Sequence, residues 1–255
     1  MDITQEIKGL ALSRGADLVG VASCGDLPDN AESFSRLLPG ARRVVVVASR
    51  HNLAALSSGI NEVAQFDTIH TYDETARATH AVARRLADHG HAGVAVPAFI
   101  PLDMAAPKKG MRGEIDWRRA AVRAGLGSYG ENGLLVTPKF GSAVRLSGVV
   151  TDADLTIDEP LAEDACDHCC TCVTDCPPGA LTGGGVIDKK KCGDHIFRYG
   201  FRYFQSLMAG VLSGDPGARS IIEGQGLREV WQNFMTGNYY YCFRCQVHCH
   251  RSPPK

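Results

Sequence analysis

The sequence predicts two domains, an α/β layered domain over residues 1–155 and a small α+β domain over residues 156–255. Short apolar runs alternate with amphipathic stretches as far as residue 150, a pattern typical of a sheet packed against helices. Beyond that point the composition changes, because nine of the ten cysteines lie after residue 165. An acidic segment that ends at Pro160 separates the two parts and marks the domain junction.

The elements of the first domain follow from local patterns. We expect helices at 3–14, from about 72 to 90, and at 116–124, and strands at 17–22, 44–48, 93–97 and 144–150. The four consecutive valines at 44–47 indicate a strand that is buried on both faces. Asp73 is expected to cap the second helix, because aspartate accepts hydrogen bonds from free N–H groups at a helix start.

Length, charge and the amino terminus restrict the function. The chain has 255 residues and a net charge of −1, which argues against a broad electrostatic grip on nucleic acid or an anionic membrane. No run approaches the roughly 20 apolar residues of a membrane-spanning helix, and residues 1–6 lack the features of a secretory signal. We therefore expect a cytoplasmic protein without a membrane partner.

Residues 125–130 spell G-x-G-x-x-G, the pattern of a dinucleotide fingerprint. That fingerprint needs a strand before it, whereas a helix is expected here, so a dinucleotide site is disfavoured. The glycines instead suit a helix end with left-handed backbone, or a place where bare backbone lets a large ligand approach. On the second interpretation Gly125, Gly127 and Gly130 are candidate cofactor-binding residues. Basic residues just upstream, among them Arg118, would form a solvated helix face or meet a phosphate-bearing cofactor.

The cysteine pattern carries the strongest functional signal. The first run is Cys166-x2-Cys169-x2-Cys172-x3-Cys176-Pro177. This is the spacing of bacterial ferredoxins, in which three thiolates bind one [4Fe–4S] cluster and the fourth binds another. Disulfides are a poor account, because cytosolic thiols are kept reduced. Zinc, the competing metal, closes its site with four ligands and explains this run with its final proline poorly.

A second run near the carboxyl end completes the thiolates for two clusters. It supplies three cysteines, and Cys192 is the natural eighth ligand. The crossover rule assigns one cluster to Cys166, Cys169, Cys172 and Cys249, and the other to Cys176, Cys192, Cys242 and Cys245. Cys24 and Cys170 are left over, and Cys170, as the neighbour of Cys169, is expected to point away from the cluster.

With both cysteine runs, Cys192 and the segment 124–127 in hand, the chain resembles the epoxyqueuosine reductase family. It is also similar to the iron–sulfur part of corrinoid-dependent reductive dehalogenases. The resemblance implies a nitroreductase-like α/β domain that holds cobalamin and a ferredoxin-like domain that feeds it electrons. It further implies base-off cobalamin, reduced to cob(I)alamin, and an acidic side chain that supplies a proton to the substrate.

The resemblance also suggests catalytic residues. The family's aspartate lies before an Ala-Pro pair, which Asp103 matches loosely, so Asp103 is the candidate proton donor and Asp116 the reserve. A surface or capping role is the alternative for both. Tyr129, inside the glycine pattern, is a second candidate catalytic residue. The chain departs from the family at Ser128 and Glu131, where tryptophan and lysine are usual.

The leading hypothesis is an iron–sulfur oxidoreductase that passes single electrons through two clusters to a corrinoid centre in the first domain. The alternative is an electron carrier or reductive activator for a partner corrinoid protein, and flavin is a less favoured cofactor. We expect a low-potential electron donor such as a ferredoxin or flavodoxin, and a small-molecule substrate or a corrinoid-protein partner. Transfer RNA is a doubtful partner, because the net charge is near zero and no helical-repeat domain follows the second cysteine run.

Overall fold

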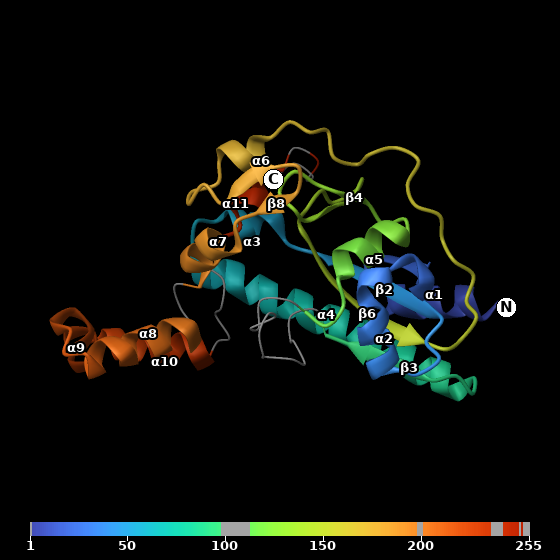
Figure 1. Cartoon of the computed structure of the whole chain (residues 1–255), viewed down its shortest axis with the longest axis horizontal. Coiled ribbons are helices and arrows are strands. Elements are labelled where there is room, and N and C mark those ends of the chain that lie inside the picture. Colours follow the sequence, from blue (N-terminus) through green and yellow to red (C-terminus); the bar gives the residue numbers. More distant parts are fainter. Residues whose placement is uncertain (1, 98–112, 198–200, 236–241, 250, 252–255) are drawn as a thin grey trace.

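The computed structural model describes residues 2–97, 113–197, 201–235, 242–249 and 251, and it has a mixed α/β fold (Figure 1). The amino-terminal part is built on one antiparallel sheet with the strand order β1-β2-β6-β3. The strands are β1 (Leu18–Ser23), β2 (Arg43–Arg50), β3 (Gly93–Val96) and β6 (Val144–Thr151). The two longest strands, β2 and β6, pair along their whole length and form the centre of the sheet.

Helices cover both faces of this sheet, which confirms the interpretation of the valine run. The helices of this part are α1 (Ile3–Ser13), α2 (Ala31–Leu37), α3 (Leu53–Ser57), α4 (Asn61–Asp88) and α5 (Trp117–Arg123), with two short 3-10 helices at Cys24–Asp26 and Pro28–Asn30. Val44 and Val46 belong to an apolar core shared with α2 and α5, whereas Val45 and Val47 belong to a second core shared with α1 and α4. Successive side chains of a strand point to opposite faces, so one run of valines serves both cores.

The long helix α4 begins at Asn61, earlier than expected, and Asp73 lies inside it, so the prediction that Asp73 caps a helix is wrong. The first turns of α4 do not show an apolar pattern in the sequence, because threonines form much of their buried face. These include Thr68, Thr71 and Thr75. Their hydroxyls remain buried because they bond to carbonyls of the same helix; the Thr68 hydroxyl, for example, donates to the Ala64 carbonyl at 2.9 Å.

Between residues 152 and 170 the chain has neither helix nor strand and lies against the first part of the molecule. Asp158 fastens it there, because its carboxylate accepts a hydrogen bond from the Val21 N–H at 2.7 Å and lies 2.5 Å from Lys8 Nζ. The backbone N–H of Asp158 also donates to the Val21 carbonyl at 2.9 Å. The expected domain boundary at residue 155 falls within this stretch.

The cysteine-rich region is made of short elements. They are α6 (Thr171–Thr174), β7 (Leu181–Gly183), β8 (Val186–Ile187), α7 (Lys189–Ile196) and α11 (Arg244–Val247). A hairpin of the amino-terminal part, formed by β4 (Ser128–Tyr129) and β5 (Leu135–Val136), lies beside these elements (Figure 1).

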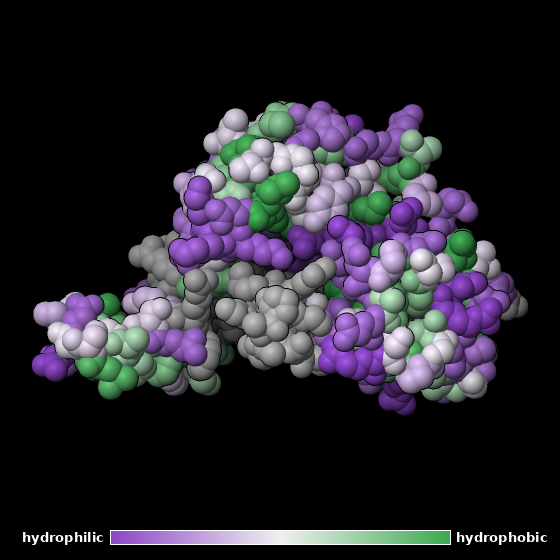
Figure 2. Space-filling view, viewed as in Figure 1, coloured by the Kyte–Doolittle hydropathy of each residue, from purple (hydrophilic) through white to green (hydrophobic). Residues whose placement is uncertain are grey.

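Three helices between α7 and α11 form a separate unit at one end of the molecule (Figure 1). They are α8 (Phe201–Leu212), α9 (Pro216–Glu223) and α10 (Gly226–Met235), and they pack around a small core of Leu207, Ala218 and Val230. Apolar side chains lie on the surface of this unit, among them Leu212 and Trp231 (Figure 2). Within the described ranges, no helix combines the length and apolar character needed to cross a bilayer.

Candidate functional site

The first predicted set of thiols surrounds one small cavity. All four of its members, Cys166, Cys169, Cys172 and Cys249, contribute to the wall. Burial raises the pKa of the Cys172 thiol to about 11, and the neighbouring cysteines Cys169, Cys249 and Cys166 add to this rise. The structure therefore brings the first three cysteines of the first run together with Cys249, the last cysteine of the chain. Cys170, which we expected to point away, also lines this cavity.

The second predicted set also comes together. Burial raises the pKa of the Cys245 thiol to about 12, and the charges of Cys242, Cys192, Cys172 of the first set, and Cys176 contribute. Burial likewise raises the pKa of Cys192, followed by the influence of Cys176 and Cys242. These interactions bring together Cys192 of α7, Cys245 of α11, Cys176, which follows α6, and Cys242, which precedes α11.

Each of the two groups has four thiols, the number that one [4Fe–4S] cluster needs. Among the residues that the structure describes, no three histidine, cysteine or carboxylate side chains converge closely enough to hold one metal ion. A [4Fe–4S] cluster makes a different demand, because each thiolate binds a separate iron atom and the four sulfurs therefore stand apart. A thiolate charge is unfavourable where burial raises the pKa of the thiol, as at Cys172 and Cys245, and binding to iron would neutralise that charge.

The β4–β5 hairpin holds both cysteine segments through hydrogen bonds. The Ser128 hydroxyl accepts from the Ala165 N–H at 2.9 Å, and the Glu131 carboxylate lies 2.6 Å from His168 Nδ1. The hydrogen bond from His168 and a second from the Gly184 N–H lower the pKa of Glu131. Ser128 and Glu131 are the two positions at which the chain departs from the family pattern, and here they fasten the loop of the first cysteine run.

The glycines of the G-x-G-x-x-G pattern have neighbours within the protein. Gly125 follows α5 with a φ of +71°, and the N–H groups of Gly125 and Leu126 close the helix by bonding to Val122 and Ala121. A Cβ on Gly127 would lie 2.2 Å from the Val136 carbonyl oxygen, so the hairpin needs a glycine there. None of Gly125, Gly127 and Gly130 belongs to the wall of the large cavity described next.

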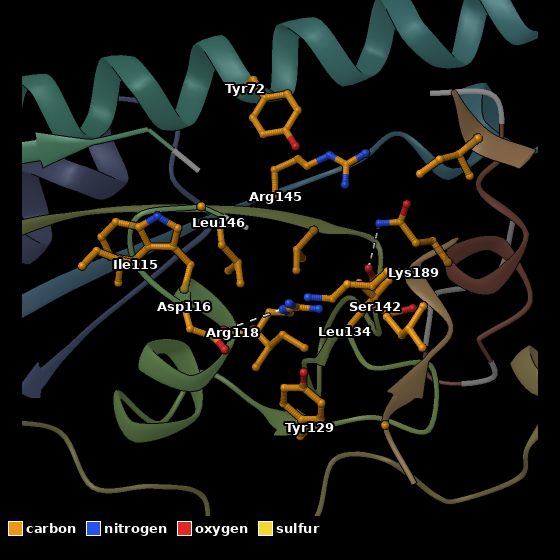
Figure 3. A pocket seen from close by; sticks show the side chains of 18 of the residues that line it. Tyr72, Ile115, Asp116, Arg118, Tyr129, Leu134, Ser142, Arg145, Leu146 and Lys189 are labelled. Carbon is orange, nitrogen blue, oxygen red and sulfur yellow. Dashed lines mark hydrogen bonds and ion pairs between the residues drawn. The ribbon is translucent and has the colours of Figure 1, made fainter. Parts of the chain in front are cut away.

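A cavity of about 470 Å³ lies between the sheet and the cysteine-rich region (Figure 3). Its volume is in the range of small-molecule sites, which is about 300–1,000 Å³. Residues of α4, α5 and β6 line it together with residues of β8, α7 and α11. The cavity therefore depends on both parts of the chain.

Two of the three candidate catalytic residues of the sequence line this cavity. Tyr129 is one, and its side chain is 39% exposed. Asp116 is the other, but its carboxylate caps α5 by accepting from the Arg119 N–H at 3.3 Å and lies 3.8 Å from Arg118 Nε. Asp103 lies outside the described residues.

The second thiol group is directly connected to the cavity wall. Ser142 and Gln246 line the cavity, and the Gln246 side-chain amide donates to the Ser142 carbonyl at 3.0 Å. The hydroxyl of Ser142 and the side-chain amide of Asn132 both donate to the Cys245 carbonyl, at 3.3 and 3.2 Å. A redox centre on the second group would therefore lie next to the cavity.

Comparison with known proteins yields relatives for part of the chain. No family model matches it. An epoxyqueuosine reductase from Bacillus anthracis is 44% identical over 80 residues, which is 31% of this chain and 21% of that protein. The resemblance predicted from the sequence is confirmed. The match spans about a fifth of the relative's length.

Solved structures share the fold over a larger part of the chain. A crystal structure of epoxyqueuosine reductase with a modified tRNA-Tyr stem loop has a TM-score of 0.53 and 21% identity, over 74% of this chain and 55% of that one. A reductive dehalogenase with B12-dependent dehalogenation has a TM-score of 0.58 and 18% identity, over 73% of this chain and 28% of that one. Because the first neighbour holds a tRNA stem loop, our expectation that transfer RNA is a doubtful partner is weakened.

Proposed function

We propose that the protein is an iron–sulfur oxidoreductase, similar to epoxyqueuosine reductase, that reduces a substrate in the large cavity with electrons from two [4Fe–4S] clusters. The contact between the Cys245 peptide and the wall of a 470 Å³ cavity carries this proposal. A reductase of this kind needs an electron-transfer centre next to a cavity that is large enough for its ligand.

Each cluster has its own set of ligands in this proposal. The first would be bound by Cys166, Cys169, Cys172 and Cys249, and the second by Cys176, Cys192, Cys242 and Cys245. The cysteine-rich region would then be a ferredoxin-like two-cluster domain packed on a nitroreductase-like α/β domain. We place the first cluster toward the external electron donor because Cys169 is exposed, and the second toward the cavity because the Cys245 peptide contacts the cavity wall.

A corrinoid is the cofactor that we propose for the cavity. When bound, it would supply a cobalt centre that takes single electrons from the second cluster. Flavin remains the less favoured alternative.

The chain's own residues would orient the ligand and handle protons. Tyr129 lines the cavity and can donate a proton from its hydroxyl. Asp116 is less suited to this task, because it is occupied with the start of α5 and with Arg118. Asp103 stays a prediction, as does a cytoplasmic location.

For the substrate, the relatives favour the epoxide of a modified tRNA nucleoside. Reduction of an epoxide to an alkene consumes two electrons and two protons and releases water. The two electrons would come one at a time from a low-potential donor such as a ferredoxin or flavodoxin. An electron carrier without an active site is the alternative, but a carrier has no need of a ligand-sized cavity at its inner cluster.

Anaerobic purification followed by analysis of iron, sulfide, cobalt and flavin tests this function. We expect about eight iron and eight sulfide per chain, since each cubane holds four of both. The Cys245→Ser variant should lose the second cluster and with it the electron transfer to added cobalamin, while Cys24→Ser, outside both groups, should keep both clusters. A colourless protein that holds zinc and no sulfide would overturn the proposal.

A further inference from the structure

We propose that a basic cleft between helices α1 and α4 binds a small anion with several phosphate groups, such as a short inorganic polyphosphate. The cleft has a volume of about 420 Å³, which is in the range of small-molecule sites. It is separate from the large cavity, because the two share no lining residue. The inference therefore goes beyond the proposed function and needs neither the clusters nor a corrinoid.

The cleft lies where the end of α1 packs beside the carboxyl half of α4. Leu10 and Arg14 line it from the end of α1. Arg77 and Arg84 line it from α4, seven residues apart, which is about two turns and about 10 Å along the helix axis. Figure 1 shows the carboxyl end of α4 on the side of the molecule away from the cysteine-rich elements α6 and α11.

The wall of the cleft has an excess of positive charge. Among its described residues one is a carboxylate, Asp88, and four are arginines, namely Arg14, Arg77, Arg84 and Arg85. Four arginines against one carboxylate leave an excess of three positive charges, although the whole chain has a net charge of −1. Cationic clefts concentrate anions, and the fork of an arginine matches the geometry of a phosphate.

Three of these arginines keep their guanidinium groups available for a ligand. The carboxylate of the wall already has a partner, because it lies 3.7 Å from Arg85 Nη1. The side chains of Arg14, Arg77 and Arg84 form no ion pair and no hydrogen bond within the part of the chain that the structure describes. Other exposed arginines of the sheet region do have carboxylate partners, among them Arg42, Arg50 and Arg119.

Stabilisation of helix ends does not explain the whole cluster. Cations near the carboxyl end of a helix interact favourably with its dipole, and Arg14 and Arg84 lie near such ends. Arg77 lies about three turns before the end of α4, where this effect is absent. Burial and then the charge of Asp17 raise the pKa of Glu74, and the charge of Arg77 opposes that rise, but Glu74 does not line the cleft.

The composition of the wall favours phosphate groups without bases or lipid chains. No described lining residue is phenylalanine, tyrosine or tryptophan, so the wall offers no such ring for stacking a nucleic-acid base. Leu10 and Ala81 are the aliphatic residues of the described wall, which is little apolar surface for a lipid chain. The arginines come from two helices, so a linear anion can contact several of them, whereas a single orthophosphate contacts fewer.

Titration calorimetry of the anaerobically purified protein at low salt tests the inference, with orthophosphate, pyrophosphate and tripolyphosphate as probes. We expect tripolyphosphate to bind about 10-fold more tightly than orthophosphate or better, with pyrophosphate between them. Arg14→Gln, Arg77→Gln and Arg84→Gln should each weaken tripolyphosphate about 3- to 5-fold, and the triple variant about 30-fold or more. Asp88→Asn should strengthen it about 3-fold, because the carboxylate of the wall is removed.

The matched control is Arg123→Gln, which removes the same charge at another place. Arg123 is an exposed residue of α5 that also lacks an ion pair among the described residues, and it does not line the cleft. Its variant should bind tripolyphosphate within about 1.5-fold of the wild type. A thermal midpoint within about 2 °C of the wild type shows that a variant is folded. Asp88→Asn, whose effect has the opposite sign, decides if an arginine variant does not fold.

Equal affinity for tripolyphosphate and orthophosphate would overturn the inference, as would an equal loss in Arg123→Gln and in the cleft variants. Unchanged or weaker binding in a folded Asp88→Asn would overturn it too. A single-stranded RNA that binds more tightly than tripolyphosphate, and that depends on the same three arginines, would assign the cleft to a nucleic-acid backbone instead. Failure of the proposed function has a different signature, namely missing iron and sulfide with polyphosphate binding intact.

Discussion

The sheet region and the cysteine-rich region are held together by different means. Two apolar cores sandwich the sheet, and both are contributed by residues up to 155. In contrast, no described residue of the segment 156–197 belongs to any of the four apolar clusters of the molecule. That segment has five of the eight thiols assigned to clusters plus a few short elements, so on the proposed function metal coordination would take the place of a core. The comparison sets a region that folds by burial against one that we expect to fold by ligation.

The largest expected effect is the selective loss of the cysteine-rich region when iron is removed. Chelation of the reduced protein should abolish hydrogen-exchange protection in α6 and α7, because these elements lack an apolar core of their own. Strands β2 and β6 should keep their protection. The measurement is hydrogen exchange by mass spectrometry before and after iron removal. Retained protection at residues 166–197 in iron-free protein would contradict the claim that this segment depends on metal ligation for its stability.

A steric change at the centre of the sheet should destabilise the sheet region and leave iron binding in the cysteine-rich region unchanged. In Gly148→Ala the new Cβ would lie 2.3 Å from Trp117 Cζ3 and 2.5 Å from the Val45 carbonyl oxygen. Neither neighbour can move freely, so we expect a loss of about 3 kcal/mol or more in the free energy of unfolding. Urea unfolding measures this loss, with iron content per folded protein unchanged.

The matched control is Gly9→Ala in the middle of α1. Nothing lies within 4 Å of a Cβ at that position. An alanine in a helix interior should therefore stabilise the protein by up to about 1 kcal/mol. A Gly148→Ala protein as stable as the wild type would show that the two cores are looser than their burial indicates.

The third prediction concerns pH at the place where the regions meet. His51 directly follows strand β2. Its Nδ1 lies 2.5 Å from Asp67 Oδ2, and its ring contacts the Phe243 ring edge-on, with 6.4 Å between the ring centres. Burial, followed by the charge of Arg145, lowers the pKa of His51 to about 4 from an ordinary value of 6.5. The unfolded chain thus binds more protons in this range, and the folded state loses stability as the pH falls from 6.5 toward 4.

Between pH 7 and pH 5 this amounts to about 2 kcal/mol in the free energy of unfolding. Urea unfolding at both values measures it, followed through Trp117 in a Trp231→Phe background. The His51→Asn variant has no imidazole, so the difference between the two pH values should shrink by that amount. Exposed His91→Asn should retain it. If the free energy of unfolding of His51→Asn depends on pH as strongly as that of the wild type, other groups cause the pH dependence.

The sequence anticipated the parts of this molecule whose cause is local. The valine run of β2 predicts burial on two faces from a few residues, and the structure has it. The spacing of the cysteines predicts cluster ligands in the same local way, and that ligation stays a prediction. The start of α4 escaped prediction because threonines with internally bonded hydroxyls form its buried face. The large cavity could not be foreseen, because its wall is assembled from α4, α5, β6 and α7, and only folding brings these together.

The smallest expected effect is at the hydrogen bonds that join the two regions. Asn132 is 2% exposed, and its amide donates to the Cys245 carbonyl while its oxygen accepts from the Leu134 N–H at 3.0 Å. Asn132→Ala removes a donor from the neighbourhood of the second thiol group. A reduced cluster there would lose some stabilisation, so its potential should fall by about 20–60 mV, where about 59 mV corresponds to a tenfold change for one electron.

A potentiometric titration followed by electron paramagnetic resonance separates the two clusters in this experiment. Only the second cluster should shift, because Asn132 bonds to the Cys245 peptide. Ser142→Ala removes the other donor to the same carbonyl, and the double variant should shift by less than the sum of the single shifts. Ser35→Ala, whose exposed hydroxyl bonds within α2, should leave both potentials alone. Equal shifts of both clusters in Asn132→Ala would mean that the hairpin sets the stability of the whole cysteine-rich region and not the second centre in particular.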